Sequence, residues 1–281
     1  MDIGIIDIIT ILPEMIIIFG ACAILLIDFT IPDNRKCVIP MLSLATVLAA
    51  AVTTGVLSYY GFGDAVVFTG MFSADGYATF FKFILYTAAI LTILLSIRSS
   101  CKCPGSVDNK SSLSGEYYVL ILFALSGMMV MASGRDLLSL YIGMELMSLP
   151  IYALVAFKNS DKRSIEGAMK YVILGAFSSA VMLFGISLIY GFTGTTELSG
   201  VADAFLAGGL NVPAVSLAVV MLVAGFGFKI AGVPFHMWAP DAYEGAPTPI
   251  TAFMSTASKA AAFAMMLRVF MEGLYPLYDD W

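Results

Sequence analysis

Three ionisable residues stand inside long apolar stretches of the chain. Lys229 lies in the apolar run 214–230, and Lys259 and Glu145 lie in two further runs of this kind. Because 60% of the residues are hydrophobic, 12% are charged and the mean hydropathy is +0.93, such runs are typical of membrane spans. Burying an ionisable side chain in hydrocarbon is costly, so its presence there indicates a functional site. One acid and two bases at this depth indicate that protons or ions move through the protein.

The acid and one of the bases suggest a specific chemistry. Burial lowers the pKa of a lysine and raises that of a carboxyl group, whereas a nearby opposite charge does the reverse. A Lys229 that alternates between pairing with Glu145 and standing alone therefore alternates in proton affinity, as a proton relay requires. The alternative is a static ion pair that holds two helices together. Lys259 lies too far from either end of its run for its side chain to reach water, and its alternative role is to face a polar cleft without transport.

Prolines and a glycine interrupt the runs beside these residues. A proline cannot donate to the carbonyl four residues back, so Pro234 frees the carbonyl of Ile230, next to Lys229. Pro150 repeats this arrangement beside Glu145. In lipid a freed carbonyl must meet protein or water, and broken helices therefore mark ion paths. The predicted helix breaks are at Pro150, Gly232 and Pro234.

Five further ionisable residues are less specific. Lys170 lies only a few residues inside its run, so a place on the proton path and a place at the membrane interface are equally favoured. The only histidine, His236, has a reference pKa near 6.5 that suits proton transfer, but we favour a structural role in which it binds a carbonyl of the broken helix. Glu14, Lys82 and Arg268 stand near the ends of their runs and are expected to reach the interface. The alternative for Glu14, which follows Pro13, is to face another subunit.

The hydropathy pattern predicts an all-α integral membrane protein. Eight apolar segments are each long enough to cross a hydrocarbon core of roughly 30 Å. No hydrophilic stretch is long enough for a separate soluble domain, and the residues 63–72 suggest a short hairpin between two spans. The predicted segments lie near 8–28, 39–59, 77–97, 116–133, 136–157, 166–190, 214–243 and 248–270.

Lysine and arginine are distributed unevenly between the connections. Eight of them lie in the connections near 29–38, 98–115 and 158–165, and only Arg135 lies in the connections on the other side. Cytoplasmic connections of membrane proteins carry the excess of positive charge, so we expect the N-terminus on the outer side. The net charge of −6 gives no basic stripe of the kind that binds nucleic acid.

The cysteines and the motif content argue against a redox centre in this chain. The sequence contains no Gly-rich phosphate loop, no paired histidines for haem and no Cys-rich cluster. We expect free thiols rather than a metal site, because three of the cysteines fall on the predicted reducing, cytoplasmic side. The four cysteines are Cys22, Cys37, Cys101 and Cys103.

Several long motifs carry a family resemblance over essentially the whole chain. The stretch Phe228–Pro249 reads Phe-Lys-Ile-Ala-Gly-Val-Pro-Phe-His-Met-Trp-Ala-Pro-Asp-Ala-Tyr-Glu-Gly-Ala-Pro-Thr-Pro, and Ser255–Ala261 reads Ser-Thr-Ala-Ser-Lys-Ala-Ala. Together with Tyr141–Tyr152, Lys170–Ser179 and the opening Leu-Pro-Glu-Met, these motifs resemble the subunit N family of proton-pumping NADH:quinone oxidoreductase, respiratory complex I. Subunits L and M and multisubunit cation/proton antiporters are similar, but they typically carry a His-Ala-Ala-Thr run where this chain has Lys259 and its neighbours.

The resemblance implies an architecture and a set of site residues. The family has two inverted five-helix repeats, and a proton path through a glutamate on span 5, lysines on broken span 7 and on span 8, and an ionisable residue on span 12. Glu145, Lys229 and Lys259 match the first three, and Lys170 matches a lysine on span 6. The fourth position has no counterpart. We therefore expect an N-terminal fragment with spans 1–3 in residues 1–115, one antiporter-like repeat in 116–281 and no second repeat.

The implied function is that of a proton-translocating subunit in the membrane arm of an NADH:quinone oxidoreductase. Quinone reduction elsewhere in the complex would drive the switching of the buried Glu and Lys residues, so the chain would be an enzyme only as a subunit of this translocase. NADH, FMN, iron–sulfur clusters and quinone would be bound by other subunits and none by this chain. Its partners would be other membrane-arm subunits and the lipid bilayer, in a bacterial inner (cytoplasmic) membrane with the N-terminus on the periplasmic side. The alternatives are a non-conducting structural or assembly subunit and a cation/proton antiporter subunit, the latter weakened by Lys259.

Overall fold

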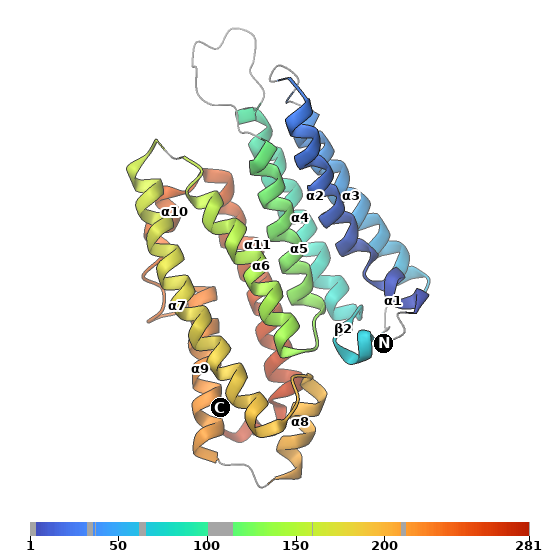
Figure 1. Cartoon of the computed structure of the whole chain (residues 1–281), viewed down its shortest axis with the longest axis vertical. Helices are drawn as coiled ribbons and strands as arrows, with labels where there is room; N and C mark the ends of the chain where they lie inside the picture. Colours follow the sequence, from blue (N-terminus) through green and yellow to red (C-terminus); the bar gives the residue numbers. More distant parts are fainter. Residues whose placement is uncertain are drawn as a thin grey trace.

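A computed structural model of the chain shows a bundle of long helices that run roughly along one direction (Figure 1). The residues that it describes are 4–32, 36, 38–61, 66–100, 115–158, 160–208 and 212–280. Some residues used in the sequence analysis lie outside these ranges, namely residues 63–65 of the predicted hairpin, the cysteines Cys37, Cys101 and Cys103, and three of the eight basic residues counted in the connections, Arg35, Lys102 and Lys110.

Among the described residues, eight helices are long and apolar enough to cross a membrane, which confirms the predicted all-α membrane architecture. Each predicted apolar segment corresponds to one of these helices or, for the seventh, to a helix and the irregular segment that follows it. The eight helices are α2 (Leu12–Thr30), α3 (Val38–Tyr59), α4 (Gly76–Ser100), α5 (Gly115–Ser133), α6 (Leu137–Val155), α7 (Lys162–Thr193), α9 (Val212–Ile230) and α11 (Thr248–Arg268).

Short elements connect the long helices. The predicted hairpin is present, with strand β1 (Val66–Val67) antiparallel to β2 (Phe72–Ser73) and the turn η3 (Phe68–Gly70) between them. It lies at the same end of the bundle as the N-terminus (Figure 1). The remaining short elements are α1 (Ile5–Thr10), α8 (Leu198–Ala207), α10 (Ala239–Gly245), the π turn η4 (Val269–Gly273) and the 3-10 segment η5 (Tyr275–Asp280).

Helix α5 lies at the centre of the bundle, and its residues are nearly all buried against α2, α4, α6 and α11. Its closest approach is to α6, at Gly127. A Cβ atom at this position would lie 2.3 Å from the backbone nitrogen of Met147, so only glycine allows the two backbones to pack this closely. Close contacts of this kind between small residues hold membrane helices together, because lipid removes the hydrophobic driving force between them.

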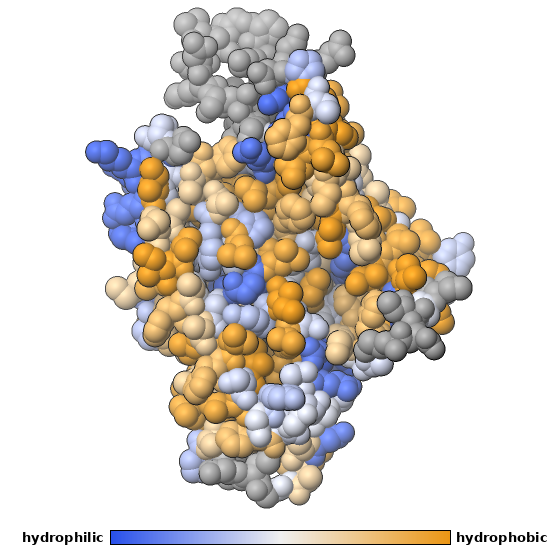
Figure 2. Space-filling view, viewed as in Figure 1, coloured by the Kyte–Doolittle hydropathy of each residue, from blue (hydrophilic) through white to orange (hydrophobic). Residues whose placement is uncertain are grey.

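The surface is apolar over most of its height. Figure 2 shows hydrophobic residues covering most of the visible face, with hydrophilic residues gathered toward the two ends and in one patch near mid-height, over α6 and α7. Exposed large apolar side chains belong to several of the spanning helices, for example Phe19, Phe29, Val52, Phe177 and Val220. Such a surface is stable in contact with lipid chains, as expected for a multi-pass membrane protein.

The seventh span is broken where the sequence predicted. Helix α9 ends at Ile230, Ala231 adopts the left-handed conformation (φ 56°), and turns lead through Gly232 and Pro234 to α10. By contrast, Pro150 does not break its helix, because α6 continues past it to its end at Val155. A single proline removes one N–H donor, whereas the seventh span also contains Ala231, whose backbone dihedral angles are not helical. The predicted break at Pro150 is therefore wrong.

Candidate functional site

Glu145 lies near the middle of α6 and is partly buried. Its carboxylate faces α7, where the hydroxyl of Ser179 donates a hydrogen bond of 2.5 Å to Glu145 Oε1. Ser179 itself is buried. The carboxylate is therefore held by a hydroxyl group from the neighbouring helix.

Lys229 is buried, with 5% of its surface exposed, in the last turn of α9. Its ammonium donates a hydrogen bond of 2.8 Å to Ser148 Oγ on α6, and this hydroxyl in turn donates to the carbonyl of Met144. Residues three apart on a helix lie on the same face, so α6 presents Glu145 and Ser148 side by side. Glu145 and Lys229 each bind a serine, and no ion pair joins the two within the part of the chain that the structure describes.

Lys259 reaches the helix break from α11. Its ammonium lies 3.3 Å from the carbonyl oxygen of Lys229 and 5.0 Å from the centre of the Trp238 ring. The Trp238 Nε1–H donates a hydrogen bond of 3.0 Å to the carbonyl of Phe228. The sequence predicted a freed carbonyl at Ile230, whereas the carbonyls of Phe228 and Lys229 have these side-chain partners. The last four carbonyls of a helix lack regular intrahelical donors. The Phe228 carbonyl also accepts from the Ala231 N–H, so ending α9 at Ile230 leaves the Lys229 carbonyl, one residue earlier than predicted, for Lys259.

Trp238 is a site residue that the sequence analysis missed. It is 1% exposed, and its ring stacks on Tyr171 of α7 with centroids 4.2 Å apart and packs against Phe228 and Tyr243. It thus supports the segment after the break and presents a π face to the Lys259 ammonium, an arrangement that stabilises a cation. The sequence feature that could have identified Trp238 is its position in the motif that follows Pro234.

His236 and Lys170 lie apart from these buried groups. His236 is exposed, and Trp238 rather than His236 binds the carbonyl of the broken helix, so the favoured structural role for the histidine is wrong. Lys170 is exposed near the N-terminal end of α7, where its ammonium lies 2.7 Å from carboxylate oxygens of both Glu166 and Asp241. It therefore forms a surface ion-pair cluster between α7 and α10.

Three charges expected at the interface are instead buried. Lys82 and Glu14 are 2% and 1% exposed and form an ion pair, with 2.6 Å between Nζ and Oε1. Arg268 is 2% exposed, and its guanidinium binds both carboxylate oxygens of Asp75, Glu272 Oε1 and a backbone carbonyl. The partners come from other elements, so sequence position alone could not reveal them. The prediction that these residues reach the interface is wrong.

Asp75 lies outside the spans, between β2 and α4. Burial raises the pKa of its carboxyl group, but hydrogen bonds from Arg268 and the Ala78 backbone N–H, together with the positive charges of Arg268 and Arg135, outweigh burial. The pKa of Asp75 is therefore lowered. Because Arg135 also binds Glu272, at 2.9 Å, four charged residues link the hairpin end of α4, the α5–α6 turn and the end of α11.

Two family descriptions match the chain. Residues 134–279 match the transmembrane family described as NADH:quinone oxidoreductase/Mrp antiporter. Residues 1–98 match the family described as NAD(P)H-quinone oxidoreductase subunit 2 N-terminal.

Individual relatives and solved structures agree. The chain is 50% identical over 270 residues to "NADH-quinone oxidoreductase subunit N 2" of Rhizobium meliloti (strain 1021), covering 96% of this chain and 54% of the relative. It matches a chain of respiratory complex I from Thermus thermophilus with a TM-score of 0.74 and 33% identity, covering 92% of this chain and 53% of that one. A chain of an archaeal membrane-bound sulfane sulfur reductase matches with a TM-score of 0.75 and 26% identity, over 91% and 52% of the two chains.

The chain thus spans about half the length of the curated relatives that it matches. The resemblance to subunit N inferred from the motifs is confirmed by relatives that carry this name at 40–50% identity over most of the chain. With a family match that covers more than half of its residues, the chain belongs to the NADH:quinone oxidoreductase/Mrp antiporter transmembrane family.

Proposed function

We propose that this chain contributes one half of a proton path to a membrane-arm subunit of an NADH:quinone oxidoreductase. The observation that carries the proposal is the setting of Lys229, a buried ammonium at a helix break, held by Ser148 beside Glu145. A structural lysine would be best served by a direct carboxylate partner. A hydroxyl partner leaves the lysine free to exchange protons, because a hydroxyl group both donates and accepts hydrogen bonds.

The path runs through Glu145, Lys229 and Lys259. Ser148 accepts a hydrogen bond from Lys229 and stands beside Glu145 on α6, so a rotation of its hydroxyl links the two charged groups. An ammonium close to a carboxylate holds its proton more tightly than one alone in hydrocarbon, so approach and separation of Glu145 and Lys229 load and unload the lysine. Lys259 contacts the Lys229 carbonyl and is the next site along the path.

Lys170 and His236 are the exposed members of the proposed path. Lys170 lies near the predicted cytoplasmic end of α7, where we assign it to proton uptake, and His236 follows the break made by Gly232 and Pro234. Moving one charge across 100 mV costs about 2.3 kcal/mol, so quinone reduction elsewhere in the complex supplies the free energy.

The rest of the assignment follows the family. The relatives are named as NADH-quinone oxidoreductase subunits, so NADH, FMN, iron–sulfur clusters and quinone belong to other subunits and this chain packs against further membrane-arm subunits. Residues 116–281 form the first antiporter-like repeat and residues 1–115 a preceding unit. The chain lies in a bacterial inner membrane, with its N-terminus on the periplasmic side because the positive charges gather in the opposite connections.

The test is the variant Lys229→Ala in the complete complex. We expect proton translocation and coupled electron transfer to fall together, because the path loses its central proton-binding group. The matched control is Lys158→Ala, which removes an exposed lysine from the α6–α7 connection and should change neither rate. Unchanged pumping stoichiometry and activity in Lys229→Ala would refute the proposal.

The two alternative functions considered from the sequence, a structural subunit and an antiporter subunit, predict different outcomes. If the buried charges only position helices, Lys229→Met, which keeps the bulk of the side chain, should preserve activity while assembly responds to changes in packing. If the chain belongs to an independent antiporter, its gene alone should restore growth to a salt-sensitive strain.

A further inference from the structure

The N-terminal helices hold a buried ion pair that the proposed path does not use. Glu14 lies in the first turn of α2, and Lys82 lies on α4. Both are almost fully buried, with their charged atoms 2.6 Å apart. A buried ion pair is stable only when its remaining donors and acceptors are also satisfied.

The remaining donors and acceptors of this pair are not all met by protein groups. Glu14 Oε2 has no hydrogen-bond partner within the described part of the chain, and Oε1 meets the ammonium closely but without regular hydrogen-bond geometry. The ammonium of Lys82 has three N–H donors, and its recorded partners are this carboxylate and the face of Phe72, 5.3 Å away. The pair therefore has capacity for further polar partners.

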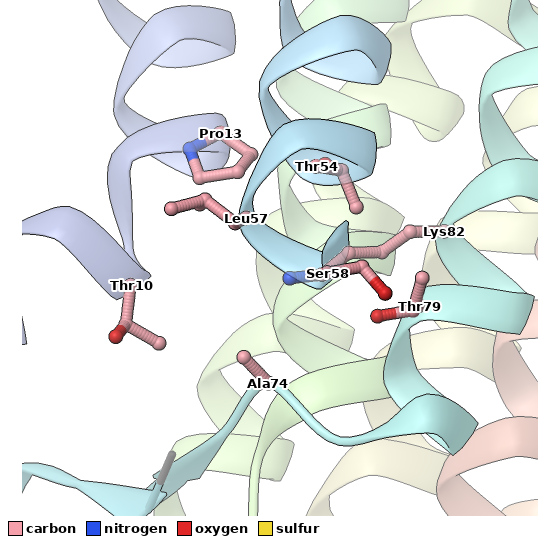
Figure 3. A pocket seen from close by; sticks show the side chains of 8 residues that line it. All are labelled: Thr10, Pro13, Thr54, Leu57, Ser58, Ala74, Thr79 and Lys82. Carbon is pink, nitrogen blue, oxygen red and sulfur yellow. The ribbon is translucent and has the colours of Figure 1, made fainter. Parts of the chain in front are cut away.

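A small cavity beside the ammonium supplies the room for them. Figure 3 shows the Lys82 side chain extending from α4 toward Ser58 of α3, with Thr79 nearby on α4. The space open to the centre of a water molecule is about 10 Å³, near the minimum that holds one water. Half of the lining residues carry hydroxyl groups, which bind water as donors and acceptors. The lining residues are Thr10, Pro13, Thr54, Leu57, Ser58, Ala74, Thr79 and Lys82.

The cavity lies at the hairpin end of the bundle. Thr10 and Pro13 flank the junction of α1 and α2, Ser58 is in the last turn of α3, and Ala74 and Thr79 flank the start of α4. These positions are all near helix ends, so we expect water to enter the cavity from the hairpin end of the bundle.

We propose that Glu14 and Lys82 form a hydrated proton-exchange site that is reached from the hairpin end and is separate from the path through Lys229. A hydronium ion in the cavity gives its proton to the Glu14 carboxylate and leaves a water molecule and a carboxylic acid, while Lys82 stays an ammonium. The reverse step returns the proton to the same water. A static ion pair needs neither a carboxylate oxygen without a hydrogen-bond partner nor a cavity lined by hydroxyl groups beside it.

Other titratable groups near the pair have their own partners. The Tyr86 hydroxyl, on α4, shares a hydrogen bond of 2.9 Å with Thr54 of the cavity wall. Asp7 of α1 accepts from a backbone N–H, and Asp75 binds Arg268. The exchange site therefore consists of Glu14 and Lys82.

Thiol labelling of the full-length protein in its complex tests whether water reaches the cavity. In a variant with every cysteine of the full-length protein replaced, including Cys22, Cys37, Cys101 and Cys103, Thr54→Cys places a thiol in the cavity wall. Val47→Cys places one deeper on the same helix, fully buried. A small charged thiol reagent that does not cross membranes should modify Thr54→Cys about tenfold faster than Val47→Cys, since only the hydrated thiolate reacts. This difference should appear only when the reagent is on the hairpin side. Equal rates in the two variants overturn the proposal, whatever the fate of the path through Lys229.

Neutral replacement tests whether the pair exchanges protons or is merely structural. The single variants Glu14→Gln and Lys82→Met each leave one uncompensated buried charge, but the double variant leaves none and should assemble normally. For an exchange site we expect the double variant to show a partial loss of proton translocation at unchanged assembly. Full recovery of translocation in the double variant identifies a static pair and overturns the proposal. Should the double variant fail to assemble, equal labelling rates still overturn the proposal, because both thiol variants keep the pair intact.

Discussion

The buried guanidinium of Arg268 provides a quantitative test of the fold. Its side chain is 0% exposed and makes four hydrogen bonds, two to Asp75, one to Glu272 and one to the carbonyl of Ala132. It also lies 4.8 Å from the centre of the Tyr77 ring. In Arg268→Met the apolar bulk stays, but Asp75, Glu272 and the Ala132 carbonyl lose the guanidinium. Among the described residues, the two carboxylates keep only the Ala78 N–H and Arg135 as donors.

The magnitude follows from the exposure of the partners. Breaking a buried ion pair by removing one member costs about 3–5 kcal/mol. The side chains of Asp75 and Glu272 are 28% and 31% exposed, so water compensates them in part. We therefore expect Arg268→Met to lower the free energy of unfolding by about 3 kcal/mol, at the lower end of that range.

Equilibrium unfolding of the full-length protein in mixed detergent micelles measures this loss. The matched control is Arg163→Met. Arg163 also donates a hydrogen bond to a carboxylate, Glu244, at 2.6 Å, but these two side chains are 74% and 62% exposed. An exposed pair contributes at most about 1 kcal/mol. The reasoning is refuted if the two variants lose similar stability, or if Arg268→Met loses less than about 1 kcal/mol.

Three further predictions address pH, packing and the proton path. Because the pKa of Asp75 is lowered in the folded protein, the contribution of this carboxylate to stability is full above the reference value of 3.8 and is lost as the pH falls through the folded pKa. The difference in unfolding free energy between the unchanged protein and Asp75→Asn should therefore shrink as the pH is lowered. A difference that grows in acid contradicts this. Gly127→Ala should cost about 1–3 kcal/mol by overpacking α5 against α6, whereas Gly55→Ala, whose Cβ meets its nearest neighbour at 3.7 Å, should cost nothing in the same unfolding assay. Ser148→Ala should lower proton translocation in the assembled complex, since Lys229 loses its hydroxyl partner, while Ser43→Ala, an equally buried hydroxyl bonded to a helix carbonyl, should not; equal effects would assign Ser148 to packing alone.

Hydropathy and backbone chemistry made most of the fold predictable. A run of apolar residues has few alternatives to a spanning helix, so the eight segments followed directly from composition. The break after Ile230 was predictable because Gly232 and Pro234 act on the local backbone. Pro150 shows the limit of that argument, since one missing donor is tolerated when the helix is packed on its neighbours.

The partners of the charged groups were not predictable from a single sequence. Which side chain contacts Lys229 depends on how α6 is rotated relative to α9. In the observed arrangement Lys229 binds Ser148 and not Glu145. In the same way, Lys82 and Arg268 stand near helix ends, but residues far away in the sequence cover them. Burial by tertiary packing therefore overrode distance from the helix end.

The central claim is that Lys229 carries protons rather than holding helices together. The most direct measurement is the number of protons translocated per electron by reconstituted vesicles of the complete complex carrying Lys229→Met, at equal assembled protein. The proton path predicts a lower ratio together with slower coupled electron transfer. A ratio and a rate equal to those of the unchanged complex would contradict it and would assign Lys229 to structure.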